Sequence, residues 1–131
     1  MNEPRAARVL VVEDSPFLRH ATRAVLTRRG YEVVEAADGE AALEVLRVEQ
    51  PDLIVLDLVV PRVSGIDVLR VIRADPRHAK TPVIVMSVLD PSLAGPVIRS
   101  AVQGYFRKEN ISLTKLANHV ESLLMPGERV A

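Results

Sequence analysis

The sequence predicts an α/β protein with a doubly wound sheet of five parallel strands, for three reasons. Short apolar runs alternate with amphipathic, helix-like segments along the chain. The runs are continuously apolar, which is typical of strands that are covered by helices on both faces. Residue types that favour the start or the end of a helix separate the apolar runs from the amphipathic segments. The apolar runs are residues 9–12, 31–36, 53–56, 83–86 and a short one around 105–106.

The first expected helix follows the first run. Ser15 is suited to the N-cap and Pro16 to the first helical position. One apolar face of this helix is formed by Phe17, Ala21, Ala24 and Val25. The helix is expected to end at the Arg28-Arg29-Gly30 stretch, because basic residues and glycine favour helix ends.

The second, third and last helices are also marked by caps and apolar spacing. Asp38 can cap the second helix, and Asp75-Pro76 closes the third. The apolar positions are 42, 45 and 46 in the second helix, 68, 69 and 72 in the third, and 113, 116, 117, 120, 123 and 124 in the last.

The segment between the fourth and fifth runs contains Gly95-Pro96, which is unfavourable inside a helix. The sequence therefore predicts a turn over residues 90–95 and a helix that begins near Pro96.

Size and composition are consistent with one soluble domain. The chain has 131 residues, 48% of them apolar, and its 17 basic residues balance its 17 acidic ones. Because the overall charge is balanced, it does not favour direct binding of nucleic acid, although a local basic patch stays open. No cysteine is present, and no apolar run approaches the roughly 20 residues that span a bilayer. We expect a cytoplasmic protein without membrane insertion, with a flexible N-terminus (1–7), one domain (8–124) and a tail (125–131).

Reactive side chains follow four of the five apolar runs. Glu13 and Asp14 follow the first run, Asp57 the third, Ser87 the fourth and Lys108 the fifth. In a parallel sheet the carboxyl ends of the strands meet at one edge, where such proteins place their sites. The sequence therefore predicts that three carboxylates, one hydroxyl and one ammonium group share a small site.

This set of groups has a chemical logic. Carboxylates that lie close together repel one another, so they favour a bound cation. Mg²⁺ prefers oxygen ligands and often combines one or two carboxylates with phosphate oxygens and water. A lysine and a hydroxyl can neutralise or bind phosphoryl oxygens, and a carboxylate can act as the nucleophile.

With these residues in place, the chain resembles the response-regulator receiver domain over about residues 8–124. The acidic pair Glu13-Asp14 resembles the metal-binding pair of the family. The segment Asp57-Leu58-Val59-Val60-Pro61-Arg62-Val63-Ser64-Gly65 resembles the phosphoacceptor loop, and Ser87, Tyr105 and Lys108 stand at family positions. The resemblance implies a flavodoxin-like (βα)5 receiver fold with strand order 2-1-3-4-5.

The resemblance also implies a role for each residue. Asp57 is expected to accept a phosphoryl group from a sensor histidine kinase or a histidine phosphotransfer protein. Asp14, Asp57 and the backbone carbonyl of Val59 are expected to bind Mg²⁺ (or Mn²⁺), with Glu13 acting through a metal-bound water. Ser87 and Lys108 would hold the phosphoryl oxygens.

In this family Ser87 and Tyr105 would form the conformational switch. The protein would be a signalling domain rather than an enzyme, and a stand-alone one. Its target protein would contact the face made by the fourth helix, the last strand and the last helix.

Two departures from the family pattern lead to further expectations. Glu109 follows Lys108 where the family usually has proline, so we expect a trans peptide bond there. Val59 and Leu89, two residues beyond Asp57 and Ser87, are apolar at positions that help to place the hydrolytic water in the family. We therefore expect slow loss of the phosphoryl group.

Other functions remain open at this stage. The chain could be a receiver-like interaction module that works without phosphorylation, or a shuttle in a phosphorelay. A magnesium-dependent phosphatase is disfavoured because Leu58-Val59 supplies no second acid after Asp57. A flavin-binding protein is disfavoured because Glu13 and Asp14 would repel a phosphate.

Overall fold

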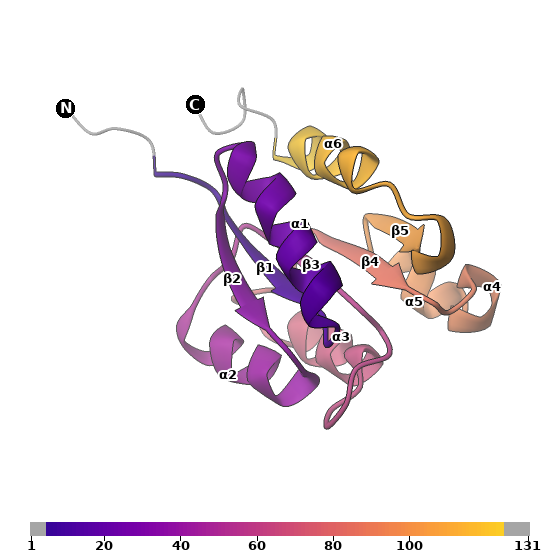
Figure 1. Cartoon of the computed structure of the whole chain (residues 1–131). Coiled ribbons are helices and arrows are strands. Elements are labelled where there is room, and N and C mark those ends of the chain that lie inside the picture. Colours follow the sequence, from indigo (N-terminus) through magenta and orange to yellow (C-terminus); the bar gives the residue numbers. More distant parts are fainter. Residues whose placement is uncertain (1–4, 125–131) are drawn as a thin grey trace.

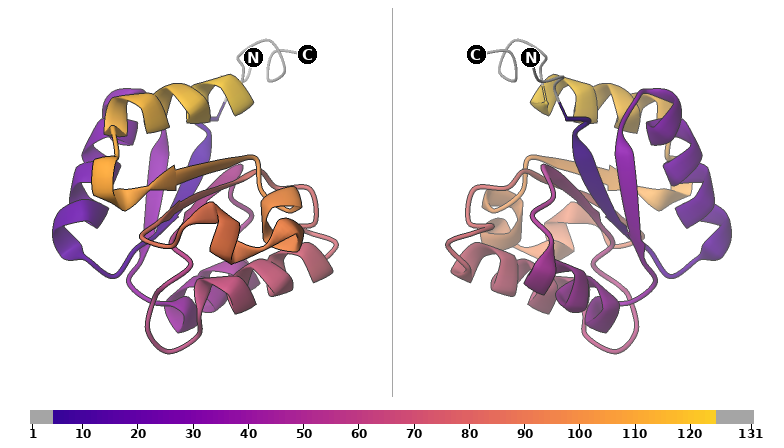
Figure 2. Two further views of the ribbon diagram at one scale, coloured as in Figure 1. Left: turned by 90° about the vertical axis from the view of Figure 1, so that its right-hand side faces the viewer. Right: turned by 90° about the vertical axis from the view of Figure 1, so that its left-hand side faces the viewer.

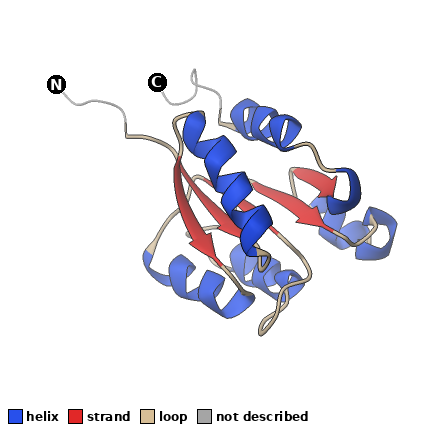
Figure 3. Ribbon diagram, viewed as in Figure 1, coloured by secondary structure: helices blue, strands red, loops and turns tan. Residues whose placement is uncertain are grey.

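The sheet is confirmed as five-stranded and parallel in a computed structural model, which describes residues 5–124. The strand order is β2-β1-β3-β4-β5, as expected. Figure 3 shows the strands between two groups of helices. The strands are β1 (Arg8–Val12), β2 (Glu32–Ala36), β3 (Leu53–Leu56), β4 (Val83–Ser87) and β5 (Gly104–Arg107).

Side-chain caps fix where several helices begin. Ser15 accepts a hydrogen bond from the amide of Leu18, and Asp38 accepts one from Ala41. Ser64 and Ser112 cap two further helices in the same way. The helices are α1 (Pro16–Arg28), α2 (Gly39–Val48), α3 (Gly65–Ala74), α4 (Pro91–Ala94), α5 (Pro96–Ser100) and α6 (Leu113–Leu123), with a 3₁₀ turn at Lys108–Asn110.

Both faces of the sheet are buried, which explains the unbroken apolar runs. Leu10 and Val12 point into a core formed with α2, α3 and α5. Val9 and Val11, on the other face of β1, join the core formed with α1 and α6. Figure 1 shows these two helical layers on opposite sides of the strands.

The apolar face predicted for α1 is partly wrong: Val25 packs against the core, but Phe17 and Ala24 are exposed. Phe17 is 84% exposed, whereas Thr22 and Leu26 are fully buried. Thr22 is tolerated in the core because its hydroxyl donates a hydrogen bond of 2.7 Å to the carbonyl of Leu18. The face that packs on the core is therefore formed by Thr22 and Leu26 with the partly buried Leu18 and Val25, and it includes a polar residue that a hydrophobic pattern does not select.

The break expected at Gly95 is confirmed. Gly95 has φ +90°, a conformation that favours glycine, and it separates α4 from α5. The residues before it form one helical turn rather than the expected irregular turn. The peptide bond between Lys108 and Glu109 is trans, as expected, because no cis bond occurs among the described residues.

The terminal boundaries were expected at residues 7 and 125. Residues 1–4 and 125–131 of the two expected end segments lie outside the described residues. Ala7 is buried and belongs to the core. Within residues 5–124, no helix has the length and apolar character needed to cross a bilayer.

The two faces of α1 lead to a stability prediction. Leu26→Ala should lower the free energy of unfolding by about 2–5 kcal/mol, because it leaves a cavity in the core. Phe17→Ala should change it by less than about 0.5 kcal/mol, because the ring is exposed. Urea denaturation of both variants measures the difference, and equal losses would contradict the assignment of the buried face.

Candidate functional site

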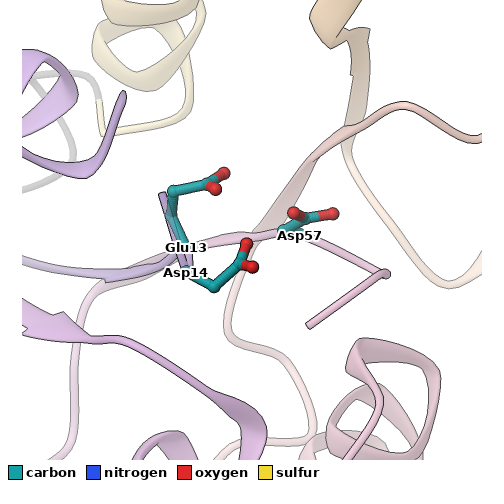
Figure 4. A group of neighbouring side chains, drawn as sticks. All are labelled: Glu13, Asp14 and Asp57. Carbon is teal, nitrogen blue, oxygen red and sulfur yellow. The ribbon is translucent and has the colours of Figure 1, made fainter. Parts of the chain in front are cut away.

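The functional side chains gather at the carboxyl edge of the sheet. Glu13 and Asp14 follow β1, and Asp57 follows the neighbouring strand β3. Each of the three offers a carboxylate oxygen, and these oxygens all lie within 4.8 Å of one another. Figure 4 shows the three side chains at the ends of their strands. The convergence expected from the sequence is therefore confirmed for the acidic residues.

Lys108 completes this group of charges. Its Nζ lies 2.6 Å from Asp57 Oδ2 and 2.9 Å from Glu13 Oε2. Glu13 and Asp57 are almost completely buried, with 0% and 1% exposure, while Asp14 is exposed. One ammonium group thus holds together two carboxylates that have little access to water.

Backbone amides hold the buried carboxylates in place. The amide of Val59 donates to Asp57 Oδ1 at 2.9 Å, and the amide of Ser15 donates to Glu13 Oε2 at 2.9 Å. Arg19 Nη1 donates to the backbone carbonyl of Glu13, also at 2.9 Å. The contacts of Ser15 and Arg19 with Glu13 were not expected from the sequence. They depend on how the chain turns from β1 into α1, and no residue pattern indicates that turn.

The loop between β3 and α3 requires a glycine where it turns back into α3. A Cβ at Gly65 would lie 2.1 Å from the backbone oxygen of Asp57, which is far below any normal contact. The loop therefore packs directly against the backbone of Asp57, and only glycine fits there.

Burial and charge shift the pKa values in this site. Burial raises the pKa of the Glu13 carboxyl, although hydrogen bonds from Lys108 and Ser15 oppose this effect. Burial lowers the pKa of Lys108, but its hydrogen bonds to Asp57 and Glu13 outweigh burial, so that the net shift is upward. Lys108 is therefore a firmly charged cation.

The donor set fits a divalent cation. Three carboxylates around one ammonium leave an excess of negative charge. Lys108 Nζ lies 2.7 Å from Glu13 Oε1 and 2.6 Å from Asp57 Oδ2, whereas Asp14 is the exposed member of the acidic group. Because oxygens of all three carboxylates lie within 4.8 Å of one another, a divalent cation would be bound by oxygen ligands that it prefers.

Ser87 and Tyr105 lie beside this group, at the loop that leads to α4. Ser87 is fully buried at the end of β4, and its hydroxyl accepts a hydrogen bond of 3.2 Å from the amide of Leu89. The Tyr105 hydroxyl donates to the carbonyl of Leu89 at 2.7 Å, and burial raises its pKa. Both predicted switch residues thus contact one residue, Leu89.

A further ion pair at this loop was not expected. Arg107 Nη1 lies 3.2 Å from Asp90 Oδ2, and Asp90 is the residue that caps α4. Arg107 directly precedes Lys108 in the chain. The pair therefore joins the loop after β4 to the end of β5, next to the site.

Comparisons with known proteins agree with the fold and the site. Residues 9–121 match the family described as the response regulator receiver domain. The transcriptional regulatory protein AfsQ1 of Streptomyces coelicolor is 34% identical over 122 residues, covering 92% of this chain and 52% of that protein. The transcriptional regulatory protein KdpE of Mycobacterium tuberculosis is 44% identical over 79 residues, covering 60% of this chain and 34% of that protein.

Solved structures share the whole fold. The response regulator TrrA of Thermotoga maritima, in complex with Mg²⁺-BeF, has a TM-score of 0.78 at 28% identity and covers 89% of this chain and 98% of its own. The signal receiver domain of a putative Luxo repressor protein from Vibrio parahaemolyticus has a TM-score of 0.83 at 28% identity, with coverage of 95% and 94%.

The fold and the acidic edge define a receiver-type signalling domain rather than a classical enzyme. The chain belongs to the response regulator receiver domain family of two-component signalling. It spans about half of AfsQ1 and about a third of KdpE.

The central role of Lys108 leads to a second stability prediction. Lys108→Met should lower the free energy of unfolding by about 3 kcal/mol, because it leaves two buried carboxylates without their cation. In a Glu13→Gln/Asp57→Asn background the same change should cost less than about 1 kcal/mol. Urea denaturation at neutral pH without divalent cations measures both losses.

Lys115→Met, at an exposed position on α6, serves as the control and should be nearly neutral. A loss for Lys108→Met that is the same in both backgrounds would show that packing, not charge, is responsible.

Proposed function

We propose that this chain is a phosphorylated receiver in which Asp57 accepts the phosphoryl group. The observation that carries the proposal is the position of Asp57, which is buried at a strand end, next to the acidic pair and 2.6 Å from the ammonium nitrogen of Lys108. An aspartate with only a structural role does not require two further carboxylates and an ammonium group around it. Perturbed, clustered ionisable groups of this kind mark functional sites.

The chemistry follows from the two oxygens of Asp57. One oxygen of the carboxylate attacks phosphorus in line with the leaving group, forming an acyl phosphate as the donor's P–N or P–O bond breaks. The leaving imidazole or acetate takes the electron pair of that bond. Lys108, which contacts Oδ2 before phosphorylation, would then form an ion pair with a phosphoryl oxygen. Ser87 would donate a hydrogen bond to another phosphoryl oxygen.

The proposed metal is Mg²⁺, or Mn²⁺ in its place. Asp14, Asp57 and the carbonyl of Val59 would bind it directly, and Glu13 would act through a bound water. When bound, the metal would neutralise charge on the phosphoryl oxygens. The similar receiver TrrA was solved with Mg²⁺-BeF, which supports the same choice here.

The proposed donor is a sensor histidine kinase or a histidine phosphotransfer protein. Ser87 and Tyr105 would pass the change at Asp57 to the face made by the α4–α5 segment, β5 and α6, which would contact the target protein. Val88 and Leu93 on this side are exposed by 60% and 74%, as is common for surfaces that bind another protein. A stand-alone receiver and a phosphorelay shuttle are both compatible with this proposal.

Phosphorylation is tested by intact mass after incubation with acetyl phosphate and Mg²⁺. The wild type should gain one phosphoryl group, because the metal and Lys108 neutralise the incoming charge. Asp57→Asn should gain none, and neither should the wild type with EDTA. Asp52→Asn, at a partly exposed aspartate just before β3 and so at the opposite end of the strand from Asp57, is the matched control and should be labelled normally.

Failure with acetyl phosphate calls for a panel of histidine kinases and phosphotransfer proteins. If these also fail, the receiver acts without phosphorylation, as an interaction module. Labelling of Asp57→Asn to the same extent as the wild type would place the phosphoryl group elsewhere.

The lifetime of the phosphoryl group gives a separate prediction. Val59 is 53% exposed beside Asp57 and offers no polar group to place a water molecule. Val59→Asn should therefore shorten the lifetime several-fold, because an amide can orient the attacking water. Decay is followed by intact mass after the donor is removed. Val48→Asn, at an exposed position on α2, is the control, and rapid decay of the wild-type phosphoprotein would contradict the expected slow loss.

A further inference from the structure

The broken helix leaves a groove between α3 and the α4–α5 segment. The groove has a volume of about 470 Å³ and is lined by Ile66, Leu69, Arg70, Arg73, Ala94, Gly95, Pro96, Val97, Ile98 and Ala101. Figure 2 (left) shows α4 and α5 lying beside α3. This groove contains none of the residues assigned to the phosphoryl site, so it needs an explanation of its own.

The floor of the groove is apolar. Leu69 and Ile98 are buried there, and Val97, at the edge, is 76% exposed. Gly95 has φ +90° and allows the chain to turn between the two short helices, so that both reach the groove. An exposed valine next to an open apolar groove is a surface that a partner side chain can cover.

The charge of the groove is positive. Two arginines line it and no acidic residue does. Arg73 donates all its hydrogen bonds to neutral oxygens, so its charge has no carboxylate partner among the described residues. Arg70 pairs with Asp67, but both side chains are more than half exposed, and such pairs exchange partners at little cost.

We propose that this groove binds an acidic, amphipathic segment of a partner protein, with apolar side chains on the floor and a carboxylate near Arg70. An apolar floor with a cationic edge is complementary to such a segment. Nucleic acid would match the charge but not the floor. A second copy would bring a second pair of arginines if the same groove were used on both chains, and like charges would then meet.

The proposed contact does not depend on phosphorylation, because every residue that carries it lies outside the acidic edge. The groove lies where the α4–α5 segment meets α3, whereas β5 and α6, which belong to the face assigned above to the target, contribute no residue to it. Binding by the unphosphorylated protein and by Asp57→Asn separates this proposal from the proposed function.

The experiment is selection from a random-peptide phage library on the unphosphorylated wild-type chain, with counter-selection on Val97→Asp. Val97→Asp adds a negative charge at the edge of the groove without disturbing a buried residue. The peptides enriched should combine leucine, isoleucine or phenylalanine with aspartate or glutamate. Their affinities are then measured by fluorescence anisotropy.

Matched variants test the charge. Arg70→Gln should weaken the selected peptides roughly fivefold, and added salt should weaken them too. Arg47→Gln removes an arginine from another exposed i,i+3 pair, on α2, and should leave binding unchanged. Val48→Asp, at an exposed valine on the same helix, is the control for Val97→Asp.

Three results would overturn the proposal. The first is a selection in which no enriched peptide depends on Val97. The second is enrichment of basic or uncharged peptides, or equal binding by Arg70→Gln. The third is a dimer of the wild type in sedimentation velocity that Val97→Asp dissociates, because a second copy would then occupy the groove.

Discussion

The site depends on one lysine that balances buried carboxylates. Asp57 and Glu13 are carried by neighbouring strands and have almost no contact with water, so each needs a positive partner close by. Lys108, which follows the edge strand β5, supplies this charge: its Nζ lies 2.6 Å from Asp57 Oδ2 and 2.9 Å from Glu13 Oε2. This is possible because a parallel sheet brings the ends of β1, β3 and β5 to the same edge.

The sequence predicted the features that follow from this constraint. Strands buried on both faces read as unbroken apolar runs, and the residue after each run falls at the carboxyl edge. Glu13, Asp57 and Lys108 could therefore be placed together before any coordinates were known. The break at Gly95 was equally predictable, since glycine followed by proline is unfavourable inside a helix.

Features that arise from three-dimensional contacts could not be predicted. The buried face of α1 was predicted only in part: Val25 packs against the core, but the polar Thr22 was not expected there, and its hydrogen bond to the Leu18 carbonyl is what allows its burial. Arg107 appears as an ordinary surface cation in the sequence. Its pairing with Asp90 requires the loop after β4 to lie against β5, which depends on the whole sheet.

The two short helices on either side of Gly95 are held in different ways, α4 by contacts of the loop before it and α5 by the core. Leu89 and Asp90 bond to Tyr105 and Arg107, so the start of α4 is tied to the edge of the site, yet α4 itself buries no residue. Beyond Gly95, α5 is anchored in the core by Ile98. The start of α4 is therefore held by polar contacts of the loop before it, whereas α5 is held by packing in the core. The groove beside α3 rests mainly on α5, which is why its binding should survive the loss of Asp57.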